Sequence, residues 1–248
     1  MKNKNSEDML DIGKKILQQL NESSKKVTRD LIIVQNRLYA QMESLSWLQR
    51  SLSIKGQLPP LRGWATSPDV LLRLHSHIMN TKPSVLVEFG SGASTLVIAD
   101  ALRQNGFGKL ISVEHSEHYG EQTLATLQAE CLQPWVDLRI GELEPWTSIH
   151  LNPDGAEKPS YWYPVELLNG LECIDLLWVD GPPAATCLYS RYPALPALFE
   201  RLSDNAQVWM DDTIRQEEKD ICQRWAEDYG FELEYFPLEK GLGILSRK

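Results

Sequence analysis

The sequence predicts an α/β fold in which a mostly parallel sheet carries a ligand site along the edge where its strands end. A short apolar run over 85–87 has the length and composition of a buried parallel strand. It continues through a glycine-rich turn, 88–92, into the stretch 94–99, which indicates the start of a helix. Two further apolar runs, 111–114 and 174–180, also end in an acid, so acidic side chains recur at the ends of predicted strands.

The glycine-rich turn has the spacing Glu88-x-Gly90-x-Gly92, which differs from the Gly-x-Gly-x-x-Gly of dinucleotide sites. Glycines let backbone N–H groups approach a ligand closely, and a helix N-terminus presents unpaired donors. The Glu88 carboxylate ahead of the glycines suits a ligand with a cationic end. Glu114 follows about 20 residues later, where an acid can accept both hydroxyls of a ribose. Together these features predict a cofactor site, with a cofactor-free strand–turn–helix as the alternative.

Composition and charge narrow the class of protein. The length of 248 residues fits one α/β domain with an appendage. A net charge of -9 argues against a general nucleic-acid binder, which needs a basic surface. No run of about 18 apolar residues is present to span a membrane, and the polar N-terminus lacks the apolar segment of a secretory signal. Four scattered cysteines without a Cys-x-x-Cys pair indicate reduced thiols, so we expect a cytoplasmic protein.

The segment 1–58 differs from the rest, 59–248, in having no proline and many polar residues. With Leu10 at heptad position a, seven of the eight a and d positions from Val27 to Leu52 are apolar, Gln41 being the exception. This pattern predicts a coiled coil that joins copies of the chain into a homo-oligomer. An amphipathic helix packed on its own domain is the alternative.

The remaining pattern alternates between helices and strands. Residues 144–170 are the least regular stretch, and their aromatic side chains, Trp162 among them, predict an ordered lid or an acceptor-binding wall, with a hydrophobic plug as the alternative. The last two strands are close enough in sequence to form an antiparallel pair. We expect helices near 68–80, 94–105, 117–131, 191–204 and 214–229, and strands near 85–87, 109–114, 135–140, 174–179, 206–210, 231–236 and 241–246.

Three acids mark the ends of two neighbouring predicted strands, Asp180 after one and Asp211-Asp212 after the next. Ligands of open α/β sheets bind beyond the carboxyl ends of strands, so these acids should share one crevice with Glu88 and Glu114. Such acids repel one another unless they are protonated or share a cation, and oxygen ligands suit Mg²⁺ or Mn²⁺. Arg191 and Arg215 lie near the same edge, either to bind an acidic acceptor or to form salt bridges with the acids.

These motifs, with the Gly181-Pro182-Pro183 that follows Asp180, resemble class I S-adenosylmethionine-dependent methyltransferases over residues 67–248. The resemblance implies a Rossmann-like methyltransferase fold with a seven-stranded, mostly parallel sheet of order 3-2-1-4-5-7-6 behind an N-terminal helical extension. It implies S-adenosylmethionine as the cofactor. The acceptor it implies is a hydroxyl of a small molecule or glycan, above all a sugar of surface-polysaccharide biosynthesis. The implied cofactor contacts are Glu88, Gly90, Ser91, Gly92, Ser94, Thr95, Glu114, His115, Glu142 and Asp180.

The acid cluster resembles the metal site of catechol and sugar O-methyltransferases, which implies Asp180, Asp211 and Asp212 as metal ligands. Catechol enzymes have a His and a Lys soon after the first acid, and this chain does not. The sequence therefore leaves open a metal-free enzyme in which Asp180 is the base. Asp180 and Asp211 are the predicted catalytic residues, and the predicted substrate contacts are Arg191, Tyr192, Arg215 and Trp162.

Two other classes of function remain open at this point. One is a non-catalytic scaffold that keeps the fold and oligomerises through its N-terminal helix. The other is a related enzyme with a nucleotide-like cofactor, such as an aminopropyl transferase or an NAD enzyme, although the glycine spacing disfavours NAD.

Overall fold

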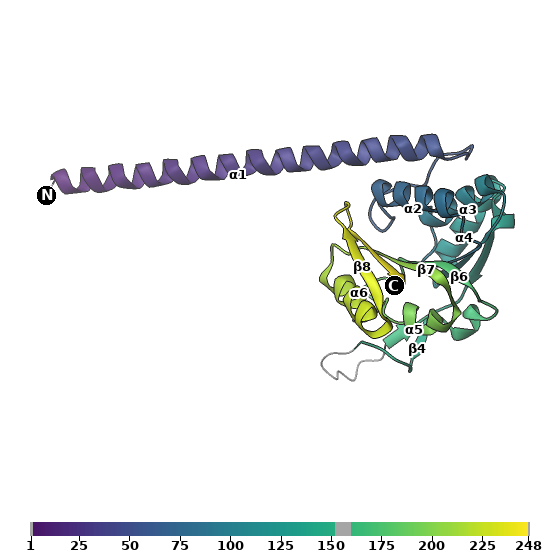
Figure 1. Cartoon of the computed structure of the whole chain (residues 1–248). Coiled ribbons are helices and arrows are strands. Elements are labelled where there is room, and N and C mark those ends of the chain that lie inside the picture. Colours follow the sequence, from purple (N-terminus) through teal and green to yellow (C-terminus); the bar gives the residue numbers. More distant parts are fainter. Residues whose placement is uncertain (1, 152–159, 248) are drawn as a thin grey trace. The chain divides into compact units, whose positions relative to one another are not determined.

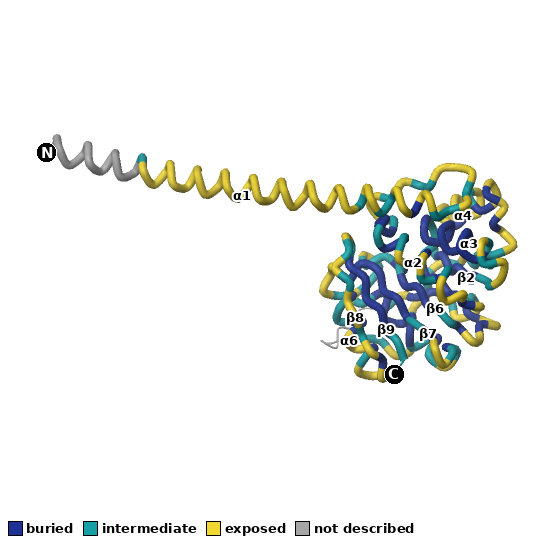
Figure 2. The backbone as a smooth tube through the Cα atoms, turned by 45° about the horizontal axis from the view of Figure 1, so that its top comes forward, coloured by how far each residue is buried: buried dark blue, intermediate teal, exposed yellow. Residues whose placement is uncertain are grey.

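The structure, a computed structural model, describes residues 2–151 and 160–247, with side chains described from residue 13 onward. The chain divides into two compact units, Met1–Glu43 and Ser44–Lys248. Helix α1 (Lys2–Ser51) forms the first unit and continues into the second. From residue 13 to residue 43 almost every residue of α1 is exposed (Figure 2). The helix is thus confirmed, whereas its pairing in a coiled coil stays a prediction, and the side chain of Leu10 lies outside the described residues.

The second unit is built on a seven-stranded sheet of order β3-β2-β1-β6-β7-β9-β8. Figure 1 labels β6, β7 and β8 of this sheet. The first five strands in that order are parallel, and β9 is antiparallel to both of its neighbours. This is the predicted order, because β6 and β7 are the fourth and fifth strands of the predicted sheet. The bounds are β1 (Val85–Phe89), β2 (Lys109–Glu114), β3 (Val136–Ile140), β6 (Ile174–Val179), β7 (Leu202–Asp211), β8 (Phe231–Phe236) and β9 (Leu242–Arg247).

Helices cover both faces of this sheet, which explains why its central strands are apolar on both sides. Neighbouring residues of β1 illustrate this, since Leu86 packs in the core under α2, α3 and α4, whereas Val87 packs in the core under α5 and α6. Helix bounds are α2 (Pro68–Thr81), α3 (Ala93–Asn105), α4 (Glu117–Ala129), α5 (Ala194–Leu198) and α6 (Gln216–Tyr229), with 3₁₀ turns η1 (Gln133–Trp135), η2 (Val165–Leu168) and η3 (Phe199–Arg201). No helix within the described ranges is long and apolar enough to cross a membrane.

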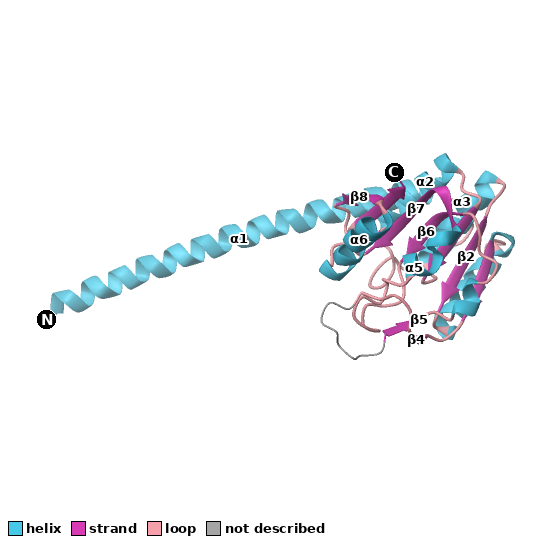
Figure 3. Ribbon diagram, turned by 60° about the horizontal axis from the view of Figure 1, so that its bottom comes forward, coloured by secondary structure: helices cyan, strands magenta, loops and turns pink. Residues whose placement is uncertain are grey.

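Two predicted elements differ from the structure. The stretch expected to be irregular contains an antiparallel pair, β4 (Glu144–Trp146) and β5 (Ser160–Trp162), which forms a sheet of its own (Figure 3). The helix expected over 191–204 is shorter, because Leu202 already pairs with Ile174 in the main sheet.

Candidate functional site

The glycine turn after β1 passes tightly over the end of β6. The Gly90 N–H donates to the carbonyl of Val113 on β2 at 2.9 Å. Gly90 has φ +90°, and a Cβ added there would lie 3.2 Å from the backbone carbonyl of Asp180. The turn therefore requires glycine at this position both for its left-handed backbone and for the approach of the two strand ends.

Glu88, two residues before Gly90, is buried beneath the glycine turn. Its side chain is fully buried and accepts hydrogen bonds from the hydroxyls of Ser94 at 2.5 Å, Thr95 at 2.6 Å and Ser112 at 2.6 Å. Burial raises the pKa of Glu88 to about 7, against the opposing effect of these hydroxyls. These hydrogen bonds brace the start of α3, and the contact of Glu88, Ser94 and Thr95 with the cofactor stays a prediction.

We expect the Glu88→Gln variant to differ from the wild type in the pH dependence of its stability. In the folded chain Glu88 keeps its proton up to its pKa of about 7, whereas in the unfolded chain it loses it near the ordinary pKa of 4.5. The folded state thus binds more protons between these values, so rising pH destabilises it, by on the order of 3 kcal/mol in all. Urea unfolding at pH 5 and pH 8 measures the difference between the two proteins, and curves that stay parallel would refute the protonated, buried Glu88.

Glu114, at the end of β2, ties the glycine turn to the neighbouring strand. Its Oε2 accepts from the N–H of Ser91 at 2.8 Å and from the Ser91 hydroxyl at 3.0 Å. Its Oε1 accepts from the N–H of Ser116 at 2.8 Å and lies 3.0 Å from Nδ1 of His115. Burial alone would raise the pKa of Glu114, but these contacts outweigh burial and lower it. The carboxylate is therefore ionised and lies at the predicted sheet edge, and its binding of ribose hydroxyls stays a prediction.

Asp180 follows β6 and is held at both oxygens. Nη2 of Arg191 donates to Oδ1 at 3.1 Å, and the hydroxyl of Thr66 donates to Oδ2 at 3.1 Å. The Asp180 N–H donates to the carbonyl of Phe89 at 3.0 Å, which fixes the end of β6 against β1. Burial raises the pKa of Asp180 to about 6, although Arg191 opposes the shift.

Arg191 is the cation that the acid cluster shares. Its guanidinium, almost fully buried, also donates to Oδ2 of Asp212 at 2.9 Å and to the backbone carbonyl of Asp211 at 3.2 Å. Burial lowers the pKa of Arg191, but the surrounding carboxylates raise it further than burial lowers it. Of the two roles considered for Arg191, salt bridging with the acids is therefore the one found.

The remaining acids and Arg215 complete the cluster. Asp211 is fully buried, its Oδ1 accepts from the N–H of Asp212 at 2.8 Å, and burial, with the neighbouring carboxylates, raises its pKa well above the ordinary value. Arg215, partly exposed, donates to Asp212 and, at 2.8 Å, to Glu218. The sequence did not predict that Glu218 and Thr66 belong to this cluster. Glu217 and Glu218 are adjacent in the first turn of α6, and nothing in the sequence indicates which of them contacts Arg215.

These residues do not fit a divalent cation. Arg191 stands where Asp180 and Asp212 converge, and the raised pKa of Asp211 favours its neutral form, which is a poor metal ligand. Within residues 2–151 and 160–247, no group of three or more acid, histidine or cysteine side chains is arranged to hold a metal ion. We therefore derive no step through Mg²⁺ or Mn²⁺.

An aromatic segment at the end of β5 packs against the end of β1. Trp162 is fully buried, packs against Phe89 with ring centroids 4.9 Å apart, and so matches the hydrophobic plug better than an acceptor wall. Tyr163 stacks on Phe89 at 5.2 Å, and its buried hydroxyl has no hydrogen-bond partner among the described residues. A Cβ on Gly181 would lie 2.4 Å from that hydroxyl, which places Tyr163 against the loop after Asp180. The sequence places Tyr163 in the aromatic stretch, but it does not predict the contacts of Tyr163 with Phe89 and Gly181.

The other predicted contacts take different positions. Tyr192 is buried and its ring centroid lies 6.3 Å from that of Trp225, so it packs in the core, and its contact with a substrate stays a prediction. Glu142 is exposed after β3, and His115 is partly exposed beside Glu114. The structure thus brings the turn, Glu114 and the acid cluster to one edge, and leaves Tyr192 and Trp162 beneath it.

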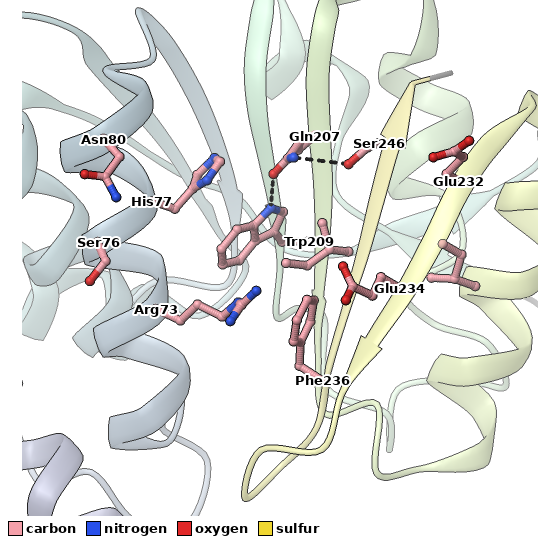
Figure 4. Close-up of a pocket in the computed structure, with 12 residues that line it drawn as sticks. Arg73, Ser76, His77, Asn80, Gln207, Trp209, Glu232, Glu234, Phe236 and Ser246 are labelled. Atoms are coloured by element: carbon pink, nitrogen blue, oxygen red, sulfur yellow. Dashed lines mark hydrogen bonds between the residues drawn. The ribbon is translucent and has the colours of Figure 1, made fainter.

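A separate groove of about 480 Å³ lies between α2 and strands β7, β8 and β9 (Figure 4). Trp209 forms its floor, with Nε1 donating to Gln207 at 2.8 Å, and Arg73 lies over the ring of Phe236 at 3.6 Å. None of the predicted site residues lines this groove.

Comparison of the chain with known proteins identifies a protein family that matches the region containing this site. A family model described as a methyltransferase domain matches residues 87–213, more than half of the chain. No curated protein matches the chain.

Solved structures share the fold at low sequence identity. A methyltransferase from Geobacter sulfurreducens is 15% identical with a TM-score of 0.53, over 86% of this chain and 89% of that one. A Podospora anserina methyltransferase bound to S-adenosylhomocysteine is 16% identical with a TM-score of 0.56, over 84% and 88%. A Bacillus cereus O-methyltransferase in complex with the same compound is 14% identical with a TM-score of 0.56, over 84% and 90%.

The strand order and the glycine turn beside an acid-rich sheet edge define a Rossmann-like methyltransferase fold. The chain belongs to the methyltransferase domain family whose model it matches.

Proposed function

We propose that this methyltransferase transfers the methyl group of S-adenosylmethionine to a hydroxyl of a small molecule or glycan without a metal ion. The observation that carries the proposal is the joint placement of the Gly90 turn, Glu114 and Asp180 at one sheet edge. The turn and Glu114 would hold the cofactor, with His115 and Glu142 on the side where the adenine is expected. The bound cofactor supplies an electrophilic methyl group, and the protein's task is to place and activate the acceptor.

Asp180 is the residue that we propose for acceptor activation. With its pKa raised to about 6, it is ionised at neutral pH and yet basic enough to accept the hydroxyl proton. Arg191 and Thr66 hold its two oxygens, so its orientation does not depend on the acceptor. Arg215, with a side chain 41% exposed, is more accessible to an acidic acceptor than Arg191, whose side chain is 4% exposed.

A sugar of surface-polysaccharide biosynthesis is the acceptor class that we propose first, on the resemblance of the sequence motifs. The side chains of Cys131, Cys173, Cys187 and Cys222 are free, which supports a cytoplasmic location.

Isothermal titration with S-adenosylhomocysteine tests the cofactor part of the proposal. We expect binding in the micromolar range, equal within twofold in Mg²⁺ and in excess chelator, because Arg191 supplies the cation of the acid cluster. Methyl transfer to a panel of sugars and catechols should likewise be unaffected by the chelator. Loss of transfer in chelator, restored by Mg²⁺, would establish metal dependence instead. Absence of binding in every condition would favour the non-catalytic scaffold.

A further inference from the structure

The seam of α1 consists of the a and d positions from Leu20 to Gln41, all of which are exposed except the partly buried Gln41. Its apolar members include Val27, Leu31, Val34 and Leu38, whose exposed fractions lie between 53% and 63%. A stripe of this kind at heptad spacing buries itself against another helix. Two of its positions are polar, Ser24 at a and Gln41 at d, and two charges flank it at g, Asp30 and Arg37.

We propose that this seam pairs with the same seam of a second copy in an antiparallel, two-stranded coiled coil in which Leu31 faces the partner's Val34. The inference is independent of the methyltransferase reaction. In an antiparallel pair each a position packs against a d position of the other helix, so the register is fixed once one such layer is chosen. This choice also sets Val27 against the partner's Leu38.

The polar positions favour this register. It places Ser24 in the same layer as the partner's Gln41, so each polar core residue meets a polar group and no apolar layer contains one. A shift of the register by one heptad would place each of them in a layer with an apolar side chain, which is a less favourable neighbour for a polar group in a buried seam. Matched polar residues are a known means of setting coiled-coil register.

The flanking charges favour the antiparallel orientation. In this register Asp30 lies beside the partner's Arg37, and by symmetry Arg37 lies beside the partner's Asp30. In a parallel pair the neighbours of the g positions are e positions of the next heptad, so Asp30 would face the partner's Gln35 and Arg37 would face the partner's Met42. Only the antiparallel pair forms opposite-charge contacts at both sites.

The seam ends where α1 enters the methyltransferase unit. Leu48, the next d position after Gln41, is fully buried in that unit against Leu71 and Val97. It is therefore not available to a second helix, and the paired segment ends before it. The exposed Ile32, Ile33 and Tyr39 lie outside the seam and remain on the outer surface of a two-stranded assembly.

Charge reversal in the full-length chain tests the register, with sedimentation equilibrium as the readout. The wild type should be a dimer. Asp30→Arg and Arg37→Asp each replace two attractive contacts by two repulsive ones and should weaken the dimer about tenfold at low salt. The double variant Asp30→Arg/Arg37→Asp restores both contacts and should return to within about threefold of the wild type. Failure of the double variant to recover would overturn the pairing of these positions, and a monomeric or larger wild-type assembly would overturn the two-stranded association.

A matched control separates the seam from general charge effects. Arg29→Asp makes the same charge change as Arg37→Asp at an f position, which faces away from the seam, and should leave the dimer unchanged. Binding of S-adenosylhomocysteine should be the same in all these variants, since none alters the methyltransferase unit. A dimer lost in Arg29→Asp as well would mean that net charge, not the pairing, controls association.

Disulfide crosslinking tests the orientation directly, with the linked peptides identified by mass. Val27→Cys combined with Leu38→Cys should link residue 27 of one copy to residue 38 of the other. Each single variant should fail to link to itself, because identical positions are offset by 11 residues, about 16 Å along the helices, too far for a disulfide. Self-linking of Val27→Cys alone would show parallel helices and overturn the proposal.

Discussion

Replacing Gly90 with alanine is expected to weaken binding of S-adenosylhomocysteine at least about 30-fold and to lower methyl transfer in proportion. The backbone there has φ +90°, which an alanine adopts only with strain. The new Cβ would also lie 3.2 Å from the backbone carbonyl of Asp180 and 3.3 Å from the Gly181 nitrogen. Neither neighbour is a flexible side chain, so the turn and the end of β6 must move apart. Isothermal titration measures the lost affinity.

Gly106→Ala is the matched control for this prediction. Gly106 ends α3 with φ +77°, and a Cβ added there meets nothing within 4 Å. It should therefore cost about 1 kcal/mol of stability from backbone strain while leaving the affinity within twofold. If the two variants lost affinity equally, the effect would come from a general loss of stability, and the close approach at Gly90 would have no special part in binding.

The strands of the sheet, and the edge of the sheet at which the acids gather, could be predicted from the sequence because both depend on local sequence patterns. Strands buried on both faces are short apolar runs, and the acids Glu114, Asp180 and Asp211 follow them directly. Parallel strands then bring these acids to one edge whatever the loops do. The strand order was confirmed for that reason, and so were the positions of the seven strands, although β7 begins at Leu202, four residues before its predicted start.

The direction of the Glu88 side chain follows from the same pattern, although it was not predicted. Side chains alternate along a strand, so Val87 and Phe89 face one core and Leu86 the other. Glu88 shares the face of Leu86 and points toward the start of α3, where Ser94 and Thr95 donate to it. The alternation of side chains along β1 was therefore enough to predict that the Glu88 carboxylate lies beneath the glycine turn and points toward α3.

The sequence places Arg191 near the sheet edge and offers salt bridges to the acids as one of its two roles, but the particular contacts of Arg191 and Tyr163 depend on loops and no local pattern encodes them. Arg191 precedes the short helix α5, yet its guanidinium reaches the ends of both β6 and β7. Tyr163 follows β5, in a stretch expected to be irregular, and stacks on the last residue of β1. Both contacts join segments far apart in sequence, so only the folded chain reveals that a guanidinium occupies the position expected for a metal.

Replacing Asp180 with asparagine is expected to lower turnover by a factor of about 10² to 10⁴, the usual contribution of a general base. The change should leave the affinity for S-adenosylhomocysteine within about fivefold, since the carboxamide of Asp180→Asn would keep an oxygen for Arg191 and place an NH₂ group beside the Thr66 hydroxyl. In the wild type, kcat/KM should rise with pH and level off above about pH 6, because the base acts only after Asp180 has lost its proton. In the variant this rise should be absent.

Asp137→Asn controls for the loss of one carboxylate, since Asp137 lies on β3 and pairs with Arg139 at 2.8 Å, away from the acid cluster. Its turnover and pH profile should match the wild type. Retention of turnover within fivefold in Asp180→Asn would exclude a proton-accepting role and leave Asp180 as a residue that only positions Arg191. A loss of turnover with an unchanged pH profile would assign the titration near pH 6 to another group. The hydroxyl of Tyr163, which has no hydrogen-bond partner among the described residues, is not that group, because burial raises its pKa well above 10.0. The pH profile therefore distinguishes a base from a positioning residue, which the loss of rate alone does not.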